Sequence, residues 1–185
     1  MPAGKRRADA RGIAQGILTM SLILMTLVLW GSWMGYHRLV DTRARIQQIV
    51  TQGLASGMIT PVSQGGGYET EAFGGTGVPQ FDLAGVIQQA ARVAQANVPG
   101  STAAVTATGF QWVLPPMDQR RWDVQGPITV QGVQWTTQAP VELKALVTGA
   151  LHVRLFGVAS LTVPLHLPLS IPVVGQQAPA QFQSY

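Results

Sequence analysis

The densest group of side chains capable of chemistry is the run MDQRRWD, at residues 117–123. Two carboxylates and two guanidinium groups stand within six positions of one another: Asp118, Arg120, Arg121 and Asp123. These four charged residues make the run a candidate recognition loop. The alternative is a hairpin tip between two strands whose acidic and basic residues pair with each other, which contributes little to stability at a surface.

The other titratable residues predict neither catalysis nor metal binding. His37, His152 and His166 are far apart in the sequence, and none has a second ligand at the spacing of a metal site. The chain has no cysteine, which excludes thiolate zinc ligands and thiol nucleophiles. No nucleophile motif and no phosphate-binding loop is evident. We therefore expect no catalytic residue, no metal ligand and no cofactor, and we predict that the protein is not an enzyme.

The charge distribution points to a membrane surface. Only 11% of the residues are charged, against roughly 25% in an ordinary soluble protein. Residues 1–59 carry a net charge of +5, and residues 60–185 carry a net charge of −1. The basic residues thus flank an apolar segment, as membrane anchors do, and leave no basic face on the remainder of the chain. Nucleic acid is therefore not an expected partner.

Residues 12–36 form an uncharged apolar run that predicts one transmembrane helix. At 1.5 Å per residue, a helix of this length crosses a hydrocarbon core of about 30 Å. Trp30, Trp33 and Tyr36 stand at its end, where aromatic rings favour the headgroup layer. A cleavable signal peptide is the alternative, but its apolar region would be shorter. We expect residues 1–11 to be a basic cytoplasmic tail and the C-terminal part to lie outside the cell membrane.

Small residues at four-residue spacing predict a helix-packing face within this segment. Gly12 and Gly16 form one such pair, and Gly31 and Gly35 form another. Glycine at this spacing lets two helix backbones approach closely, although glycine is also common in membrane helices that do not associate.

The helix is expected to continue beyond the membrane as an amphipathic extension over residues 37–58. Its apolar stripe recurs at helical spacing and includes Leu39, Ile46, Ile49 and Val50. No proline interrupts the chain between Pro2 and Pro61, and Gly53 and Gly57 are expected to mark the fraying end. The stripe requires a partner, either the chain's own β domain or a neighbouring subunit, and we expect it to act as an assembly stripe.

The remainder predicts a glycine-rich linker over residues 59–80 and an extracytoplasmic β-rich domain over residues 81–185. Asp82 is a predicted N-cap, with Phe81 and Val86 as a hydrophobic staple, for a helix from Leu83 to about Ala96. Alternating apolar residues then predict strands at 103–113, 128–137, 141–155 and 159–171, with a bulge at 148–149 and with prolines that place the last strand at a sheet edge.

The three tryptophans of this domain, Trp112, Trp122 and Trp135, are expected to fill its core rather than form a binding face. The predicted fold class is therefore α+β. It consists of one long N-terminal transmembrane and amphipathic helix and a small, mostly antiparallel β domain with one short helix.

The order of the segments resembles that of type IV pilin-like proteins. The resemblance rests on the basic N-terminal residues, Arg11-Gly12, the apolar helix, its amphipathic extension closed by Ala55-Ser56-Gly57, and the β-rich tail. Among pilin-like proteins the arrangement looks most like the TadE-like pseudopilins. The resemblance covers the architecture of the whole chain, whereas its specific sequence content lies in residues 5–57.

The resemblance implies a helix that bundles with those of identical or related subunits in a pilus or secretion apparatus. It also implies that prepilin peptidase cuts after Gly12 and exposes Ile13. Ile17 departs from the family pattern, which has glutamate at this position to pair with a neighbour's N-terminal amine. The expected function is thus a membrane-anchored, pilin-like structural subunit of a filament or a Tad-type apparatus. The alternative is a single-pass, signal-anchored protein that displays a β-rich binding domain outside the cell.

Overall fold

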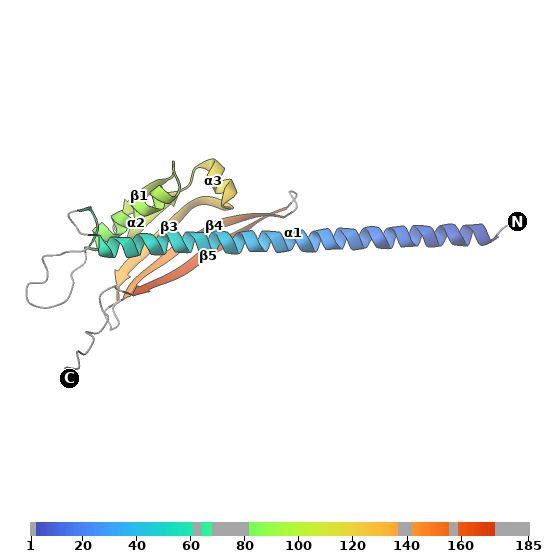
Figure 1. The fold of residues 1–185 in the computed structure, drawn as a ribbon, viewed down its shortest axis with the longest axis horizontal. Coiled ribbons are helices and arrows are strands. Elements are labelled where there is room, and N and C mark those ends of the chain that lie inside the picture. The colour runs from blue at the N-terminus through green and yellow to red at the C-terminus, as the bar shows by residue number, and fades with distance from the viewer. Residues whose placement is uncertain (1–2, 61–63, 68–81, 137–141, 156–158, 173–185) are drawn as a thin grey trace, which may run out of the picture.

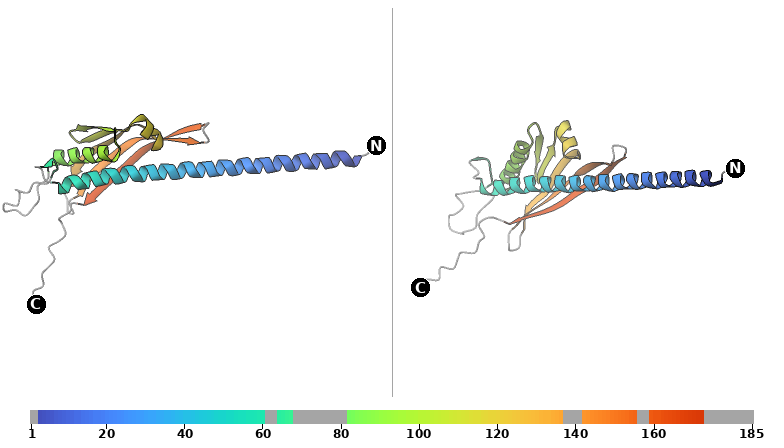
Figure 2. Two further views of the ribbon diagram at one scale, coloured as in Figure 1. Left: turned by 45° about the horizontal axis from the view of Figure 1, so that its top comes forward. Right: turned by 45° about the vertical axis from the view of Figure 1, so that its right-hand side comes forward.

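A long helix and a five-stranded antiparallel sheet make up the protein, which is therefore an α+β fold (Figure 1). The computed structural model describes residues 3–60, 64–67, 82–136, 142–155 and 159–172. In all three ribbon views the C-terminal half of helix α1 lies along the sheet, and its N-terminal half projects away from it (Figures 1 and 2). The described part of the molecule is therefore elongated.

Helix α1 runs unbroken from Ala3 to Ile59 and is about 85 Å long at 1.5 Å per residue. It confirms the single continuous helix expected from the sequence, but it begins within the segment predicted as a basic tail. Its buried face begins at Gly35. The further buried residues follow at the i+3, i+4 and i+7 spacings of one helix face: Thr42, Ile46, Ile49, Val50, Gly53, Leu54, Gly57 and Met58. This periodicity is that of a helix lying with one stripe against a core.

Helix α2, Leu83–Asn97, begins where the sequence predicts it. The side chain of Asp82 accepts hydrogen bonds from the backbone N–H groups of Ala84 (3.0 Å) and Gly85 (3.1 Å). The carboxylate thus satisfies two of the donors that a helix leaves unpaired at its N-terminus. The expected staple involves Phe81, which lies outside the described residues.

The close contact between α1 and α2 depends on two glycines that we expected to end α1. A Cβ atom added to Gly57 would lie 2.8 Å from both the Cα and the carbonyl oxygen of Val86, and one added to Gly53 would lie 3.0 Å from the Cα of Ala90. The expectation of a fraying end is therefore wrong. The helix continues to Ile59, and the glycines let its backbone touch that of α2.

Part of the predicted linker is also packed here. The backbone N–H of Gly67 donates to the carbonyl of Gly57 (2.9 Å), and that of Asp82 donates to the carbonyl of Gly67 (2.7 Å). Gly66 and Gly67 are both buried. Residues 64–67 therefore tie the end of α1 to the start of α2, while residues 61–63 and 68–81 lie outside the described part of the chain.

The sheet is a meander in the order β1-β2-β3-β4-β5, with every neighbouring pair antiparallel. Its strands are β1 (Thr102–Thr106), β2 (Gly109–Val113), β3 (Val124–Trp135), β4 (Glu142–Leu155) and β5 (Ala159–Pro172). The single strand expected at 103–113 is instead a hairpin that turns at Ala107 and Thr108. Gly109 follows this turn at a point where a Cβ would clash with the backbone of Val130 on β3.

The irregularity expected at residues 148–149 lies in the neighbouring strand. Gln125 pairs with Ala150, but Thr129 pairs with Thr148, so β3 has extra residues opposite Gly149. A second register shift follows between Gln131 and Gln134. Each bulge contains a glycine with positive φ, Gly126 (77°) and Gly132 (63°), a conformation that few other residues adopt.

Strand β5 is an edge of the sheet, as its prolines predict. Pro164, Pro168 and Pro172 pair with Ala150, Leu146 and Glu142 without interrupting the 14-residue pairing of β5 with β4. Because proline has no N–H, these residues occupy positions whose N–H would point away from β4. The free edge of β5 therefore lacks every second outward donor and is a poor template for a further strand.

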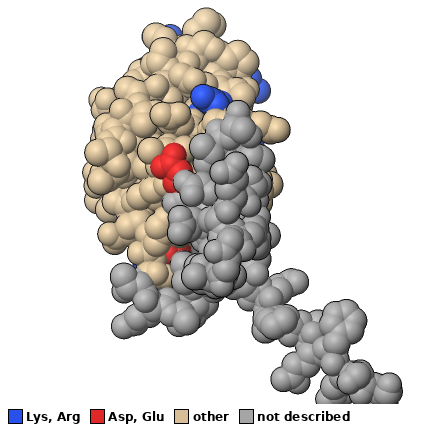
Figure 3. Space-filling view, turned by 90° about the vertical axis from the view of Figure 1, so that its left-hand side faces the viewer, with Lys and Arg blue, Asp and Glu red and all other residues tan. Residues whose placement is uncertain are grey.

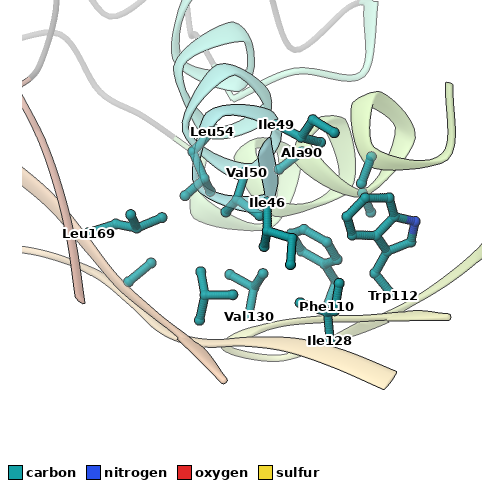
Figure 4. Packing of buried hydrophobic residues seen from close by; sticks show 14 of the residues in the cluster. Ile46, Ile49, Val50, Leu54, Ala90, Phe110, Trp112, Ile128, Val130 and Leu169 are labelled. Carbon is teal, nitrogen blue, oxygen red and sulfur yellow. The ribbon is translucent and has the colours of Figure 1, made fainter. Parts of the chain in front are cut away.

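One hydrophobic core lies between the two long helices and one face of the sheet (Figure 4). Helix α1 contributes Ile46, Ile49, Val50 and Leu54, and α2 contributes Ala90 among others. The sheet contributes buried residues from four strands: Phe110, Trp112, Ile128, Val130, Leu143, Val147, Leu165, Leu167, Leu169 and Ile171. The C-terminal half of α1 is thus part of the domain and not a separate stalk.

Substituting Gly57 by alanine tests the close contact between the two helices. The new methyl group would meet the backbone of α2, so we expect the variant to lose about 1–3 kcal/mol of unfolding free energy. Gly16→Ala is the matched control, because nothing lies within 4 Å of a Cβ at Gly16. Urea unfolding of the full chain in mild detergent, followed by tryptophan fluorescence, measures both. Equal stability of the two variants would contradict the packing of Gly57 on α2.

Candidate functional site

The most exposed apolar surface of the described chain is the N-terminal half of α1. Every large apolar side chain from Ile17 to Tyr36 is at least 48% exposed. Within the described residues, α1 is the one helix long and apolar enough to cross a membrane, and none of its most apolar 18-residue window is buried. Surfaces of this kind on soluble proteins are rare and mark interaction with lipid or with another chain.

The boundary between the free and the covered parts of α1 coincides with the aromatic end of the apolar run. Trp33 and Tyr36 are exposed, whereas Gly35 is the first buried residue. His37 lies beside Trp33, with ring centroids 4.2 Å apart. The domain therefore covers the helix only from the point at which the sequence predicts that it leaves the membrane.

The four glycines proposed for helix packing fall into two groups. Gly16 is exposed, with open space around it, and is available to a neighbouring helix. Gly31 is half-buried and Gly35 is buried, so Gly35 is not a free packing surface. Gly12 lies within α1, as does Ile13 of the expected processing site, but their surroundings lie outside the described part of the structure.

The residues of the expected assembly stripe already pack against other parts of the same chain. Ile46, Ile49 and Val50 are buried in the core, and Leu39 packs against that core as a half-buried residue. This corrects the expectation that these residues contact neighbouring subunits. Of the two partners that the sequence left open, the structure selects the chain's own sheet and α2, which supply the complementary apolar face.

The MDQRRWD run forms a short helix, and not a hairpin tip. Helix α3 spans Pro116–Arg121 between β2 and β3, with Pro116 at its first turn. It lies at the end of the domain that faces the projecting half of α1 (Figure 1). Arg120 and Arg121 are exposed, and Asp118 is half-buried.

A pocket of about 410 Å³ lies between α1, α3, β3 and β4. Most of its lining residues are of polar types, and they come from these four elements and from the end of the loop before β3: Arg38, Pro116, Gln119, Arg120, Asp123, Val124, Gln125 and His152. Of the four charged residues singled out in the sequence, the structure brings Arg120 and Asp123 into this pocket. Asp118 and Arg121 do not line it.

Asp123 is the residue that joins these segments. Its φ angle is +51°, in the left-handed region that aspartate tolerates better than most residues. Its backbone carbonyl accepts a hydrogen bond from the N–H of His152 (2.6 Å), which ties it to β4. Its Oδ2 atom lies 3.2 Å from Nε of Arg38, which ties it to α1. The expected pairing within the MDQRRWD run is thus replaced, for Asp123, by a partner 85 positions away.

The electrostatic environment of Asp123 favours its neutral form. Its side chain is only 15% exposed, and this burial raises the pKa of the carboxyl above its ordinary value of 3.8. The charges of Arg38 and His152 act in the opposite direction and lower the pKa, but by less than burial raises it. The ion pair therefore compensates only part of the cost of removing this carboxylate from water.

His152 is less exposed than its alternation with Leu151 and Val153 predicts. The residue is half-buried, and its Nδ1 atom is buried with no hydrogen-bond partner among the described residues. His166 lies exposed on β5. Within the described ranges, no group of three or more histidine or acidic side chains has the arrangement of a metal site.

The tryptophans of the domain pack as expected. Trp112 is fully buried, and its Nε1 donates to Oγ of Ser101 (3.0 Å). Trp122 stands perpendicular to it, with ring centroids 5.8 Å apart. Trp135 packs against the same core. The three rings therefore support the fold and do not form one binding face.

The sequence did not predict that three polar lining residues of the pocket, Arg38, Gln125 and His152, lie near the MDQRRWD run. Arg38 is one of the basic residues that flank the apolar segment, and the other two lie on strands without a motif. Only the pairing of β3 with β4 and the packing of α1 on the sheet bring them together. No local signal in the sequence carries that information.

Figure 3 shows the end of the molecule opposite to the projecting helix, where the charged side chains of the described residues are isolated from one another. Lysine, arginine and acidic side chains are scattered over the described part of this face rather than gathered into a patch.

Comparison of the chain with protein-family models, with curated proteins and with solved structures found no match. The exposed N-terminal half of α1 and the pocket beside Asp123 are therefore the features that bear on the function of the chain.

Asp123→Asn tests the electrostatics of the pocket. Because the pKa of Asp123 is raised in the folded state, its contribution to stability is full below pH 3.8 and is lost as pH rises through the raised value. Asparagine stays neutral and also tolerates positive φ. We expect the melting temperatures of the variant and the parent to agree near pH 3.5, and the variant to become relatively more stable towards pH 7.

Arg38→Gln is the companion variant. It removes a charge that lowers the pKa of Asp123, so the stability of this variant should fall more steeply with pH than that of the parent. Thermal unfolding in mild detergent measures all three proteins. An Asp123→Asn protein that loses stability relative to the parent as pH rises would contradict this account.

Proposed function

We propose that the protein is a membrane-anchored structural subunit that assembles with copies of itself or with related subunits through the projecting half of α1. The observation that carries the proposal is the division of this helix at Gly35. After that point α1 contributes to the core of a folded domain, whereas residues 16–34 before it carry only apolar and small polar side chains, nearly all of them exposed. A helix divided in this way fits a segment within lipid or within a bundle of like helices.

Two other surfaces on which subunits could associate, the apolar stripe of α1 and the edges of the sheet, are unsuited to it, which supports assembly through the projecting helix. The apolar stripe of the C-terminal half is already buried. The edge strand β5 carries prolines at its outward positions, and the opposite edge strand, β1, is only five residues long. Both properties disfavour the addition of strands from a neighbouring molecule. The projecting helix is therefore the better assembly surface of the described chain.

The resemblance to pilin-like and TadE-like proteins agrees with this arrangement. Under the proposal, the N-terminus is cytoplasmic, prepilin peptidase cuts between Gly12 and Ile13, and the domain lies outside the cell. Ile17 provides no carboxylate to pair with a neighbour's amine, so contact between helices must come from apolar packing and from close approach at Gly16. The product would be a filament or part of a Tad-type apparatus.

The pocket favours a second candidate function, that of a single-pass anchored protein that displays a binding domain. Arg120 and Asp123 would then contact the partner. The two functions differ in oligomeric state: the subunit forms filaments or large complexes, whereas the display protein remains a dispersed membrane protein.

Gly16→Leu tests assembly through α1. A leucine at this position fills open space where a second helix would approach, so we expect it to abolish assembled material sheared from cells. Ser21→Leu is the matched control, because it adds a similar side chain at an exposed position on a different face of the same helix. Negative-stain microscopy and intact-protein mass spectrometry of the sheared fraction measure the outcome.

Filaments whose subunits begin at Ile13 are the expected result for the unsubstituted chain and for Ser21→Leu. Filaments that persist in Gly16→Leu would contradict packing at Gly16. A protein that starts at Met1 and occurs only as a dispersed membrane species would contradict the subunit proposal and support the display function.

A further inference from the structure

The pocket lies at the level of the membrane surface, if α1 spans the bilayer as proposed above. Arg38 stands two residues beyond Tyr36 and five beyond Trp33. At 1.5 Å per residue, it lies about 3–8 Å past these aromatic side chains along the helix. A headgroup layer is about 5–8 Å thick on each side of the hydrocarbon core. A residue at this height faces lipid headgroups directly.

The guanidinium groups of the pocket provide N–H donors for hydrogen bonds to a ligand. Arg38 uses Nε towards Asp123, which leaves its two terminal nitrogens, and its side chain is 61% exposed. Arg120 is exposed and lines the same pocket. The two arginines of the lining outnumber its single carboxylate, Asp123, so the pocket is net positive whether that carboxylate is ionised or neutral. A positive pocket is complementary to an anion.

The remaining lining residues present further polar groups. Oε1 of Gln125 accepts a hydrogen bond from Oγ1 of Thr162 (3.1 Å), which orients its amide and leaves the NH₂ group as a donor. His152 also lines the pocket, although its Nδ1 atom is buried away from it and has no partner in the described structure. The pocket volume of about 410 Å³ lies in the range of small-ligand sites.

We propose that this pocket binds the phosphate of an anionic phospholipid headgroup, with Arg38 and Arg120 as the ligands of the phosphate oxygens. Gln125 and His152 would contact the hydroxyls of a headgroup such as glycerol. Binding fixes the domain against the membrane surface at the point where α1 enters it. The inference rests on the proposed membrane anchor, but it concerns a different part of the chain.

Arg120→Gln and Arg121→Gln form the test pair. Both variants lose one positive charge at adjacent exposed positions, but only Arg120 lines the pocket. The delipidated full chain in neutral detergent is titrated with phosphatidylglycerol, and native mass spectrometry counts the bound lipid. We expect saturable binding of one lipid, weakened about tenfold or more by Arg120→Gln and unchanged by Arg121→Gln. Equal weakening by both variants would indicate surface charge alone and would overturn the site.

Two further ligands distinguish the source of the phosphate. Phosphatidylcholine carries the same phosphodiester with a fixed cation, which would face two arginines, so it should bind more weakly. Glycerol 3-phosphate carries the headgroup without acyl chains. If it binds as tightly as phosphatidylglycerol, the assignment to a lipid is overturned and a soluble phosphate compound takes its place.

Flotation of the full chain with phosphatidylcholine vesicles separates this inference from the proposed anchor. Anchored Arg120→Gln protein should still float, because its helix is unchanged. Wild-type protein that fails to float would contradict the anchor, and the detergent titration would still test the pocket. Wild-type protein that floats but binds no phosphatidylglycerol would overturn the pocket alone.

Discussion

The division of helix α1 at Gly35 is the constraint on which the rest of the structure depends. A single helix of 57 residues is too long to be covered by a domain of this size, and its two halves have opposite requirements. The C-terminal half presents one apolar stripe, which a sheet and a second helix can cover. The N-terminal half exposes apolar side chains all round, and no single soluble domain can cover such a surface. The sequence of α1 therefore provides one half that packs on the domain and one half that requires lipid or another chain to cover it.

The domain is built to hold the covered half at a fixed position. Gly53 and Gly57 bring α1 against the backbone of α2, and Asp82 caps α2 so that it starts beside them. At the other end of the domain, the ion pair of Arg38 with Asp123 connects α1 to the region where α3 and β3 meet. Helix α1 is thus attached at both ends of its buried stripe.

The elements that depend on local sequence were predictable. The continuous helix, the Asp82 cap, the last three strands and the edge position of β5 follow from hydrophobic period, capping chemistry and the missing N–H of proline. Features that depend on contacts between distant segments were not. Gly53 and Gly57 look like a helix end until Val86 and Ala90 are placed against them. The candidate site shows the same limit, because Arg120 and Asp123 are visible in the sequence whereas Arg38 and His152 reach them only through the packing of α1 and β4.

The placement of the projecting helix within a membrane is the central claim, and thiol accessibility tests it most directly. The chain has no cysteine, so single substitutions give an unambiguous signal. Ser21→Cys lies in the projecting half of α1, and Gln47→Cys lies at an exposed position of the covered half. In membranes with both faces accessible, a membrane-impermeant maleimide should label Gln47→Cys at once and Ser21→Cys only after detergent is added. Rapid labelling of Ser21→Cys without detergent would show that this half of the helix lies in water, and the account would be wrong.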